Sequence, residues 1–530
     1  MPADTTRSPR SIPGSAALLG AALLVLLVHE IALFGRHVDD AWISYRYARN
    51  LAEGLGPVFN SGERVEGYTN FLLVLFEAAF IRLGLSPDLG AKLLCMAASL
   101  ATLVVVHRAA RRWYAGDSAR AAIPALLLAV SPAYAQSAVT GLETQLFTFL
   151  VTLGLVFAVE ESDRRPVWSR AALVLGLSSL ARPEGLLFGA VGFGYRLARR
   201  ALRRELTAAD LAWPLGFLAV VVPHAAFRLL YYGDWVPNTF HAKTAGIHPS
   251  EVFFGLQYLR DWANYAGGTV VAGLVFLSLL RGARAWNTLL LAAALPYLAY
   301  VATLGGDWMP RFRFVVPVLP AGAILIGSVL CDAWDQWVRP AVASRAARRL
   351  ALGGLAAAYL LPQAIESAQL AYLARADRAS APERWRRARA LESMTAAGDA
   401  IALMPIGFIG WATRRRIVDF AGLTDPALAR RFDADYVFAR NPKLIVLGTP
   451  RDPARGTFEP GWVPDATVAA DDRFRMHYRL VDCWPPAWAP SAKGAVLLTA
   501  PGYRQVGVAG AGAYWLCVYA RDDSAGAGAR

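Results

Sequence analysis

SAALLGAALLVLLVHEIALF, residues 15–34, decides the fold, and the polar segment GRHVDDAWISYRYARN, residues 35–50, follows it at once. A helix of roughly 20 apolar residues crosses the hydrocarbon core of a bilayer. Arg7 and Arg10 precede the apolar run, as they would in a signal peptide, but no small-residue cleavage site comes after it. We therefore predict an uncleaved first transmembrane helix.

Comparable apolar runs recur along the chain as far as residue 366. Hydrophobic residues make up 56% of the 530 residues and the mean hydropathy is +0.36. A soluble chain contains about 45–50% apolar residues. We expect a polytopic α-helical membrane protein with about ten or eleven transmembrane helices. After the first run, the expected spans are 88–106, 120–135, 144–159, 170–181, 184–196, 211–230, 267–280, 285–304, 313–331 and 350–366.

Short clusters of arginine between the apolar runs predict the orientation. The net charge is +14, and its placement in these clusters is typical of membrane topology and argues against nucleic-acid binding. Because cytoplasmic loops collect Lys and Arg, the other connections are assigned to the outside. The segment 70–85, which contains Glu77 and Arg82, must then lie at the outer interface rather than span the bilayer. The external connections are 35–87, 136–143, 181–185, 231–266 and 305–312.

The composition changes at about Arg375, where Asp, Arg, Pro and Gly are interspersed with short apolar runs, as in a soluble domain. We predict a transmembrane domain over 1–370, which contains the external loop 35–87, and an external soluble α/β domain over 371–530. This second domain could bind carbohydrate or serve as a scaffold that closes the site. Strands are expected in IALMPIGFIGW, RIVDF, KLIVLG, AVLLTA and YWLCVYA, and a short helix in ALARRF.

Cys483 and Cys517 both lie in the predicted external domain, whereas Cys95 and Cys331 lie in apolar runs. An exported, oxidising compartment permits disulfides. A bridge between Cys483 and Cys517 is possible, although two cysteines of one domain need not be close in space.

Asp39 and Asp40 form the strongest candidate site, directly after the first transmembrane helix. Two carboxylates at the mouth of a span repel one another and are costly near hydrocarbon, which indicates a function. Either could act as a general base on a hydroxyl, or hold a divalent cation such as Mg²⁺ or Mn²⁺. The alternative is a solvated helix end. Glu63 and Glu66 lie in the same loop and could contribute, or could be surface charges beside turns.

Four further polar clusters fall in the external connections. Arg and Lys side chains can bind phosphate oxygens, and the remaining polar side chains could line a cavity. Each cluster also has a structural interpretation. Glu143 could be a charge at a helix start, and Arg182 could belong to a hairpin turn. His241 could be a structural histidine, and Arg311 could bind lipid head groups. The clusters are TGLETQLF with Glu143, ARPEG with Arg182, YYGDWVPNTFHAK with Asn238, His241 and Lys243, and GGDWMPRFRF with Asp307 and Arg311.

These motifs occur in an order that resembles the GT-C superfamily of polyprenyl-phosphate-dependent glycosyltransferases. DDAWISYRYARNLAEGLGPVFNSGERVEGYTNF, TGLETQLF, ARPEG, YYGDWVPNTFHAK, GGDWMPRFRFVVPVLP and IVDFAGLTDP look like the terminal β-(1→2)-arabinofuranosyltransferase family, and together they extend over about residues 38–426. The resemblance implies a polyprenyl-phosphate sugar donor, decaprenyl-phosphoryl-arabinofuranose in the best-known members, and a cell-envelope glycan acceptor. The family motif alone does not fix the sugar.

The resemblance also implies roles for individual residues. Asp39 and Asp40 match the acidic motif and are the catalytic candidates, with a possible divalent metal between them. The donor phosphate contacts would be Arg182, Lys243 and Arg311. The residues that line the cavity or bind the acceptor would be Glu66, Tyr68, Asn70, Glu143, Asn238, His241 and Asp307.

Three competing functions remain open in the sequence. A transporter or flippase of a lipid-linked sugar should show repeated halves and ionisable residues near the bilayer midplane, whereas here the charged groups cluster at one face. A GT-C enzyme that uses another sugar fits the motifs equally well. A non-catalytic assembly protein would leave Asp39 and Asp40 without a purpose. We expect a multi-pass protein of the bacterial plasma membrane whose active site and C-terminal domain face the periplasm or exterior.

Overall fold

The computed structural model describes residues 13–114, 120–164, 168–243, 249–265, 285–307, 309, 312–342, 344–450, 459–485 and 515–522. The chain folds as two compact units. The helical unit consists of Met1–Arg36, Ala91–His224 and Ile247–Ala374. The mixed unit consists of His37–Gly90, Ala225–Gly246 and Arg375–Arg530. The predicted external loop 35–87 is thus grouped with the C-terminal residues and not with the apolar helices.

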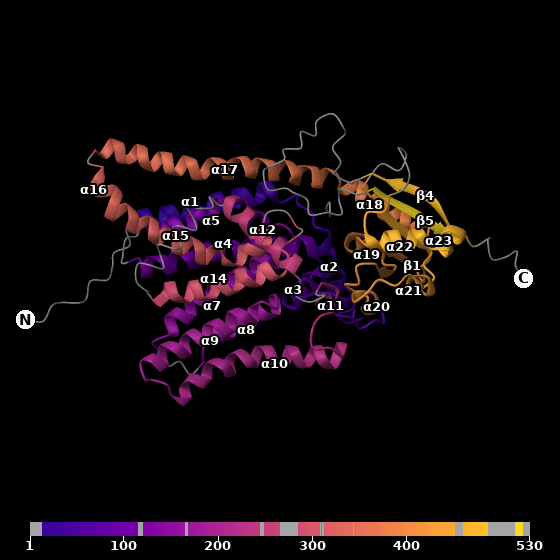
Figure 1. The fold of residues 1–530 in the computed structure, drawn as a ribbon, viewed down its shortest axis with the longest axis horizontal. Helices are drawn as coiled ribbons and strands as arrows, with labels where there is room; N and C mark the ends of the chain where they lie inside the picture. The colour runs from indigo at the N-terminus through magenta and orange to yellow at the C-terminus, as the bar shows by residue number, and fades with distance from the viewer. Residues whose placement is uncertain are drawn as a thin grey trace, which may run out of the picture. The chain divides into compact units, whose positions relative to one another are not determined.

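Long apolar helices make up the helical unit, and Figure 1 shows α7, α8 and α9 side by side in it. Leu24, Val28 and Ile31 of the first helix are 58–61% exposed, as expected for side chains that face lipid. The main helices are α1 (Pro13–Leu33), α4 (Pro87–Trp113), α5 (Ile123–Ala129), α6 (Pro132–Ala138), α7 (Thr144–Glu161), α8 (Arg170–Ala181), α9 (Gly185–Leu202), α10 (Ala212–Tyr232), α12 (Pro249–Tyr265), α14 (Ala285–Thr303), α15 (Leu319–Ala333) and α17 (Arg345–Ala379).

Fewer helices qualify as membrane spans than the sequence predicted. Among the described residues six helices are long and apolar enough to cross a bilayer, or seven if one bent pair counts as a span. The predicted span 170–181 is the 12-residue α8, whose length of about 18 Å is short of the hydrocarbon core. The predicted span 267–280 lies outside the described residues. The six are Ser15–Leu33, Pro87–Trp113, Thr144–Glu161, Ala208–Tyr232, Trp286–Thr303 and Arg313–Ala341.

The bent pair replaces the continuous span predicted over 120–135. Arg120–Ala129 and Pro132–Ala138 meet at an angle of 66°. Pro132 cannot continue the first helix, because it lacks the N–H that the helical ladder requires. Ser131 starts the second helix, since its hydroxyl accepts a hydrogen bond from the Tyr134 N–H at 3.4 Å.

A five-stranded sheet organises the mixed unit, in the order β2-β1-β3-β5-β4. β1 pairs in parallel with β2 and β3, and β5 pairs antiparallel with β3 and β4. The strands are β1 (Ala400–Leu403), β2 (Arg416–Asp419), β3 (Leu444–Thr449), β4 (Tyr478–Trp484) and β5 (Trp515–Arg521). The helices are α2 (Asp39–Ala52), α3 (Phe71–Arg82), α11 (Asn238–Lys243), α18 (Ala381–Ser393), α19 (Ile406–Thr413), α20 (Pro426–Ala429), α21 (Ala434–Ala439), α22 (Val463–Ala470) and α23 (Asp472–His477).

Four of these strands lie in runs predicted to be extended, but the long run IALMPIGFIGW was predicted wrongly. Only its beginning is a strand, and residues Ile406–Thr413 form helix α19. Pro405 sits between the two elements and has no N–H for a sheet ladder. β4 was not predicted, because its sequence YRLVDCW mixes polar with apolar residues. AVLLTA lies outside the described residues.

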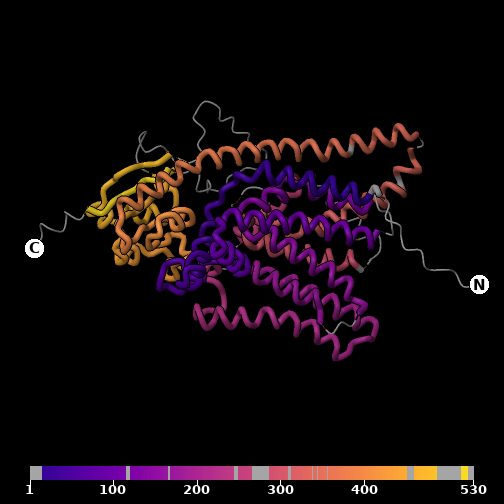
Figure 2. The backbone as a smooth tube through the Cα atoms, turned by 180° about the vertical axis from the view of Figure 1, so that it is seen from behind, coloured from indigo at the N-terminus to yellow at the C-terminus, as the bar shows by residue number. Residues whose placement is uncertain are grey.

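Each face of the sheet is covered by a different part of the chain. Ile401, Leu403 and Val446 point to one face, where they pack against Tyr47 and Tyr68 of the first loop. The alternate residues, among them Ala402, Val418 and Leu447, point to the other face and pack with Phe474 and Tyr478. In Figure 2 the indigo segment with α2 and α3 accordingly lies beside the orange C-terminal segment. The first loop therefore contributes to the core on one face of the sheet.

A disulfide joins Cys483 of β4 to Cys517 of β5, which stand opposite each other in the strand register. The pairing suggested by the sequence is confirmed. It closes a loop with a sequence separation of 34 residues, so the chain-entropy model assigns it about 3–4 kcal/mol of stability.

Replacing both residues with serine is expected to lower the free energy of unfolding of the mixed unit by about 3 kcal/mol. Chemical denaturation of the full chain in detergent, followed by tryptophan fluorescence, measures this change. The pair Cys95→Ser and Cys331→Ser is the control, because neither of those buried thiols forms a disulfide and both lie in the other unit. Equal midpoints for the two double variants under oxidising conditions would contradict the expected role of the disulfide.

Candidate functional site

Asp39 begins helix α2, and its carboxylate binds the start of another helix. Oδ2 accepts a hydrogen bond from the Gly407 N–H and Oδ1 accepts one from the Phe408 N–H, both at 2.9 Å. Gly407 is required for this approach, because a Cβ there would overlap the backbone oxygen of Asp39. Burial raises the pKa of Asp39, against the opposing effect of the two amides and of the positive Arg384. Asp39 thus joins two segments that lie far apart in the sequence.

Asp40 lies beside it in the first turn of α2 and is half-buried. Acidic residues in a first helical turn are stabilised by the partial positive charge of the helix N-terminus. Both members of the acidic pair thus share one helix end.

Arg384 of α18 is a cationic group near this pair that sequence reasoning missed. Its Nη1 donates to the Asp377 carbonyl oxygen at 3.0 Å and to the Ser380 hydroxyl. Burial lowers the pKa of Arg384, while the charges of Asp377, Asp39 and Asp88 oppose that effect. The sequence around Arg384 did not indicate this role, because Asp39 and Asp88 lie 345 and 296 positions earlier in the chain.

Aromatic rings surround the start of α2 within the mixed unit. The ring of Phe408 lies 5.0 Å from that of Trp42 and 5.1 Å from that of Trp385, in both cases edge to face. Trp42 also contacts Trp411 at 5.8 Å, and its Nε1 donates to His37 Nδ1 at 3.1 Å. Aromatic faces of this kind suit the apolar face of a sugar ring. Carboxylates, a guanidinium group and these rings thus meet in one region.

Two arginines of α2 bind the other end of α19. Arg46 Nη1 donates to the Gly410 carbonyl oxygen at 2.8 Å, and Arg49 Nη1 donates to the Trp411 carbonyl oxygen at 2.7 Å. The Arg49 guanidinium also stacks over the Trp411 ring at 4.4 Å. Helix α2 therefore contacts α19 along its whole length.

The predicted cavity residues of the first loop make buried contacts within the mixed unit. Glu66 forms an ion pair with Arg228, with an Oε2–Nε distance of 2.6 Å. Burial raises the pKa of Glu66, and the hydrogen bond and charge of Arg228 oppose this. The hydroxyls of Tyr68 and Tyr232 lie 3.0 Å apart. Asn70 exchanges hydrogen bonds with Ser44 at 3.0–3.1 Å. Acceptor binding by these residues stays a prediction.

The predicted residues around α11 divide into a buried and an exposed set. Asn238 is buried, and its Nδ2 donates to the carbonyl oxygens of Gly422 and Leu423 at 2.8 and 3.0 Å. His241 Nε2 lies 2.8 Å from Asp234 Oδ2. Lys243 is exposed, so it is accessible to a phosphate.

Arg182 lies in the helical unit, in a buried charge cluster. Its guanidinium pairs with Glu143 at 2.9 Å and with Glu184 at 2.6 Å. Asp307 pairs with Arg313 at 2.8 Å, and both guanidinium groups flank the ring of Phe314, at 5.4 and 5.0 Å. A donor phosphate at Arg182 would therefore have to compete with two carboxylates. Arg311 lies outside the described residues.

The described residues do not bring together the side chains that the predicted metal would need. In the part of the chain that the structure describes, no group of three or more His, Cys, Asp and Glu side chains could hold a metal ion. Both carboxylate oxygens of Asp39 already accept backbone N–H groups.

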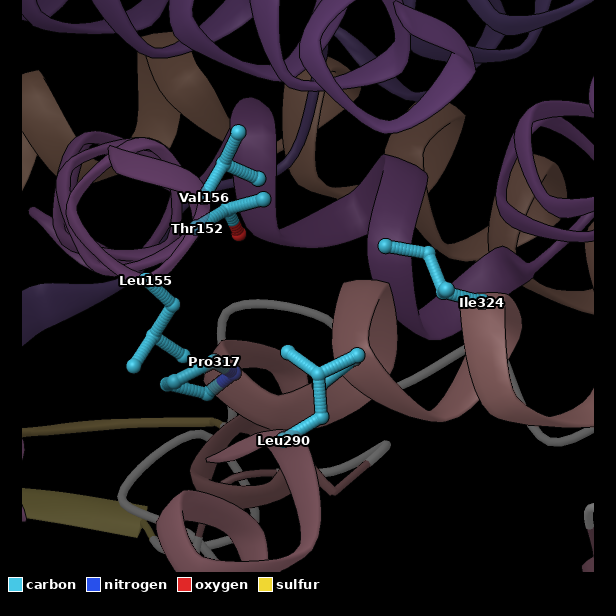
Figure 3. A pocket seen from close by; sticks show the side chains of 7 residues that line it. Thr152, Leu155, Val156, Leu290, Pro317 and Ile324 are labelled. Carbon is cyan, nitrogen blue, oxygen red and sulfur yellow. The ribbon is translucent and has the colours of Figure 1, made fainter. Parts of the chain in front are cut away.

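An apolar pocket of about 240 Å³, which includes space open to its surroundings, lies in the helical unit (Figure 3). The hydroxyl of Thr152 donates to the Thr148 carbonyl oxygen at 2.7 Å, which leaves hydrocarbon as the main lining. The apolar lining of the pocket does not suit a sugar. It is lined by Thr152, Leu155, Val156, Leu290, Pro317, Ala321 and Ile324.

Similarity to known proteins covers several parts of the chain. Residues 369–519 match a family described as a domain of unknown function (DUF8728). A terminal β-(1→2)-arabinofuranosyltransferase from Mycobacterium tuberculosis is 35% identical over 225 residues, 39% of this chain and 35% of that protein. A protein of the same name from Corynebacterium glutamicum is 28% identical over 360 residues, 57% of this chain and 49% of that protein. The matches span about a third and a half of these relatives, and they confirm the resemblance.

Solved structures share the fold. ArnT from Cupriavidus metallidurans, bound to undecaprenyl phosphate, has a TM-score of 0.56 and 16% identity over 82% of this chain and 92% of that chain. The archaeal oligosaccharyltransferase AglB from Archaeoglobus fulgidus, in complex with an inhibitory peptide and a dolichol-phosphate, has a TM-score of 0.50 and 14% identity over 82% of this chain and 69% of that chain. The predicted GT-C-like fold, with a helical membrane part and a C-terminal α/β region, is confirmed.

Proposed function

We propose that this chain is an integral-membrane glycosyltransferase that transfers arabinofuranose from a polyprenyl-phosphate donor to a hydroxyl of a cell-envelope glycan. The observation that carries the proposal is the acidic pair Asp39 and Asp40, which stands among aromatic rings and beside Arg384. The two similar curated proteins bear the name of this activity. The likeness to ArnT supports the fold that the reaction would use.

The reaction requires one carboxylate. The acceptor oxygen attacks the anomeric carbon as the bond from that carbon to the donor phosphate oxygen breaks, and polyprenyl phosphate leaves with the electron pair. The carboxylate removes the proton of the attacking hydroxyl, as a general base does. Trp42 and Trp411 are half-buried, and either ring could stack on a sugar. Arg384 and the exposed Lys243 could bind phosphate oxygens.

We place the mixed unit on the external side of the bacterial plasma membrane. The Cys483–Cys517 disulfide supports this, since such bonds persist in oxidising compartments. The arginine clusters between the apolar runs support the same orientation. No nucleotide is required there, because the lipid phosphate carries the activated sugar.

Transfer by the purified full chain in liposomes tests the proposal, with synthetic polyprenyl-phosphoryl-arabinofuranose as donor and a short arabinan as acceptor. We expect extension of the acceptor by one arabinofuranose. Activity only with another lipid-linked sugar would keep the reaction and exclude arabinose as the donor sugar. Movement of the lipid-linked sugar between leaflets without transfer would replace the proposal by a flippase.

A further inference from the structure

The helical unit contains a buried carboxyl group that the proposed transfer does not use. Glu30 of α1 is 0% exposed, and it contacts Ser99 of α4. Both helices are long and apolar enough to cross a bilayer. An ionisable side chain inside a membrane span is costly, and its presence there indicates a function. The groups around Glu30 indicate what it binds.

No positive charge balances Glu30 within the described ranges of the chain. Glu30 forms no ion pair there with Lys, Arg or His, and its polar and electrostatic contacts are with Ser99 and Tyr134. Its Oε2 is buried and has no hydrogen-bond partner among these residues. An ionised carboxylate in such surroundings would lose its hydration without compensation. A proton or another cation must therefore offset the charge.

One hydroxyl proton has to serve two contacts in this cluster. Ser99 Oγ is in hydrogen-bond contact with Glu30 Oε1 and lies 2.8 Å from the Met96 carbonyl oxygen. A serine hydroxyl has a single proton to donate, and a carbonyl oxygen can only accept. Thr102 and Tyr134 supply no further proton, because they donate to backbone carbonyl oxygens of α4 at 2.8 and 3.1 Å. The second proton must come from Glu30.

We propose that Glu30 is a proton-binding site among the membrane-spanning helices, and that it is a neutral carboxylic acid. Its Oε1–H donates to Ser99 Oγ, and the Ser99 hydroxyl donates to the Met96 carbonyl oxygen, so each contact has one proton. Oε2 is then the carbonyl oxygen of an acid. Because it carries no formal charge, its lack of a partner costs less than it would in a carboxylate.

The bound proton provides a hydrogen bond between two membrane helices. Polar side chains such as serine hold helices together in lipid, where apolar contacts give little preference. Helix α1 depends on such contacts, since its Leu24 and Ile31 side chains are 61% and 60% exposed. A second polar contact between the same helices joins Ser15 Oγ to His107 Nε2 at 3.1 Å. Without the proton, the contact at Glu30 would carry a negative charge instead.

A sodium ion is the competing occupant of this site. It could neutralise the carboxylate through Oε2, so the charge of Glu30 does not distinguish the two cations. The contacts of Ser99 do, because a sodium ion brings no proton and leaves Ser99 Oγ with two acceptors. The proton accounts for both the charge and the contacts.

Infrared spectroscopy of the full chain in lipid vesicles at neutral pH tests the proposal. The spectrum of Glu30→Gln is subtracted from that of wild type, which removes the bands of all unchanged groups. We expect the difference to contain the C=O stretching band of a protonated carboxyl group and no carboxylate band. Glu30→Leu should give the same band, and it serves if the glutamine variant does not fold.

Glu161→Gln is the matched control, because Glu161 is also buried in the helical unit but only accepts hydrogen bonds. They come from the Ser169 hydroxyl at 2.8 Å, from Arg170 Nε at 3.0 Å, and from the N–H groups of Arg170 and Ala171 at 3.1 and 3.4 Å. Its difference spectrum should contain carboxylate bands and no acid band.

Thermal unfolding in detergent compares the same two variants. In Glu30→Gln the amide donates to Ser99 Oγ in place of the acid, so the midpoint should stay within about 2 °C of wild type. In Glu161→Gln the amide NH₂ faces groups that also donate, so the midpoint should fall by at least about 4 °C.

Carboxylate bands in the difference between wild type and Glu30→Gln would overturn the proposal. A wild-type midpoint that then rises with sodium chloride, but not with choline chloride at equal ionic strength, would assign a sodium ion to the site. An equal fall of the midpoint in Glu30→Gln and Glu161→Gln would also contradict a neutral Glu30. None of these readouts involves sugar transfer, so the test stands even if the proposed function fails.

Discussion

Asp40→Asn is expected to lower kcat for sugar transfer about 100- to 10,000-fold, the usual contribution of a general base. The amide keeps the size of the side chain but cannot remove the proton of the acceptor hydroxyl. The measurement is the single-turnover rate with saturating polyprenyl-phosphoryl-arabinofuranose and arabinan. KM should change little, because stacking on the aromatic rings does not need the charge of Asp40.

Folding of the variant must be verified in the same sample. An intact Cys483–Cys517 bridge and unchanged hydrogen exchange over α19 would show that the mixed unit is native. Asp88→Asn offers a matched control, since its Oδ1 accepts from the Tyr45 hydroxyl at 3.3 Å and its charge acts on Arg384. Wild-type rates in a folded Asp40→Asn protein would remove Asp40 from the chemistry.

Arg46→Met is expected to destabilise the mixed unit by about 3 kcal/mol, because it removes buried hydrogen bonds from a charged donor to neutral acceptors. Arg46 is 4% exposed and donates to the carbonyl oxygens of Phe59, Gly410 and Arg415 at 2.7–2.8 Å. Methionine fills similar space but would remove the Arg46 donor from the Gly410 and Arg415 carbonyl oxygens, at about 1–3 kcal/mol each. The Phe59 carbonyl oxygen would still accept a hydrogen bond from Asn50 Nδ2 at 3.0 Å. Chemical denaturation of the full chain in detergent measures the loss.

Arg414→Met is the comparison for this change. Arg414 pairs with Glu53 at 3.1 Å, and the two side chains are 61% and 39% exposed, so the loss should be below about 1 kcal/mol. Arg46→Lys should lie between the two, because it keeps the charge but not the planar fork of donors. Equal midpoints for Arg46→Met and Arg414→Met would show that the buried guanidinium is not required.

Long apolar runs made the helical membrane fold predictable, since composition and length alone indicate spanning helices. The number of spans was not predictable to the same degree. The run at 170–181 reads as apolar but ends at Arg182 after 12 residues, and the run at 120–135 is broken by Pro132. In IALMPIGFIGW, periodicity cannot separate a buried helix from a buried strand.

The acidic pair was predictable because it interrupts an apolar sequence at a helix end. Its partners were not, since Gly407 and Phe408 lie 368 and 369 positions from Asp39. The resemblance implied that Asn238 and Tyr68 line a cavity, which stays a prediction. Their hydrogen bonds to Gly422, Leu423 and Tyr232 join three segments of the mixed unit. A single sequence carries no record of such long-range pairs.

The mixed unit is assembled from three separate stretches of chain, His37–Gly90, Ala225–Gly246 and Arg375–Arg530. A ribosome adds residues from the N-terminus at about 5–20 per second, so α2 and α3 are made well before the sheet that they cover. Contacts of such sequence separation form slowly, because the intervening loop must first be closed. During synthesis the apolar faces of α2 and α3 therefore remain without the sheet that covers them. That sheet is complete only when β5 has been made and has paired with β3.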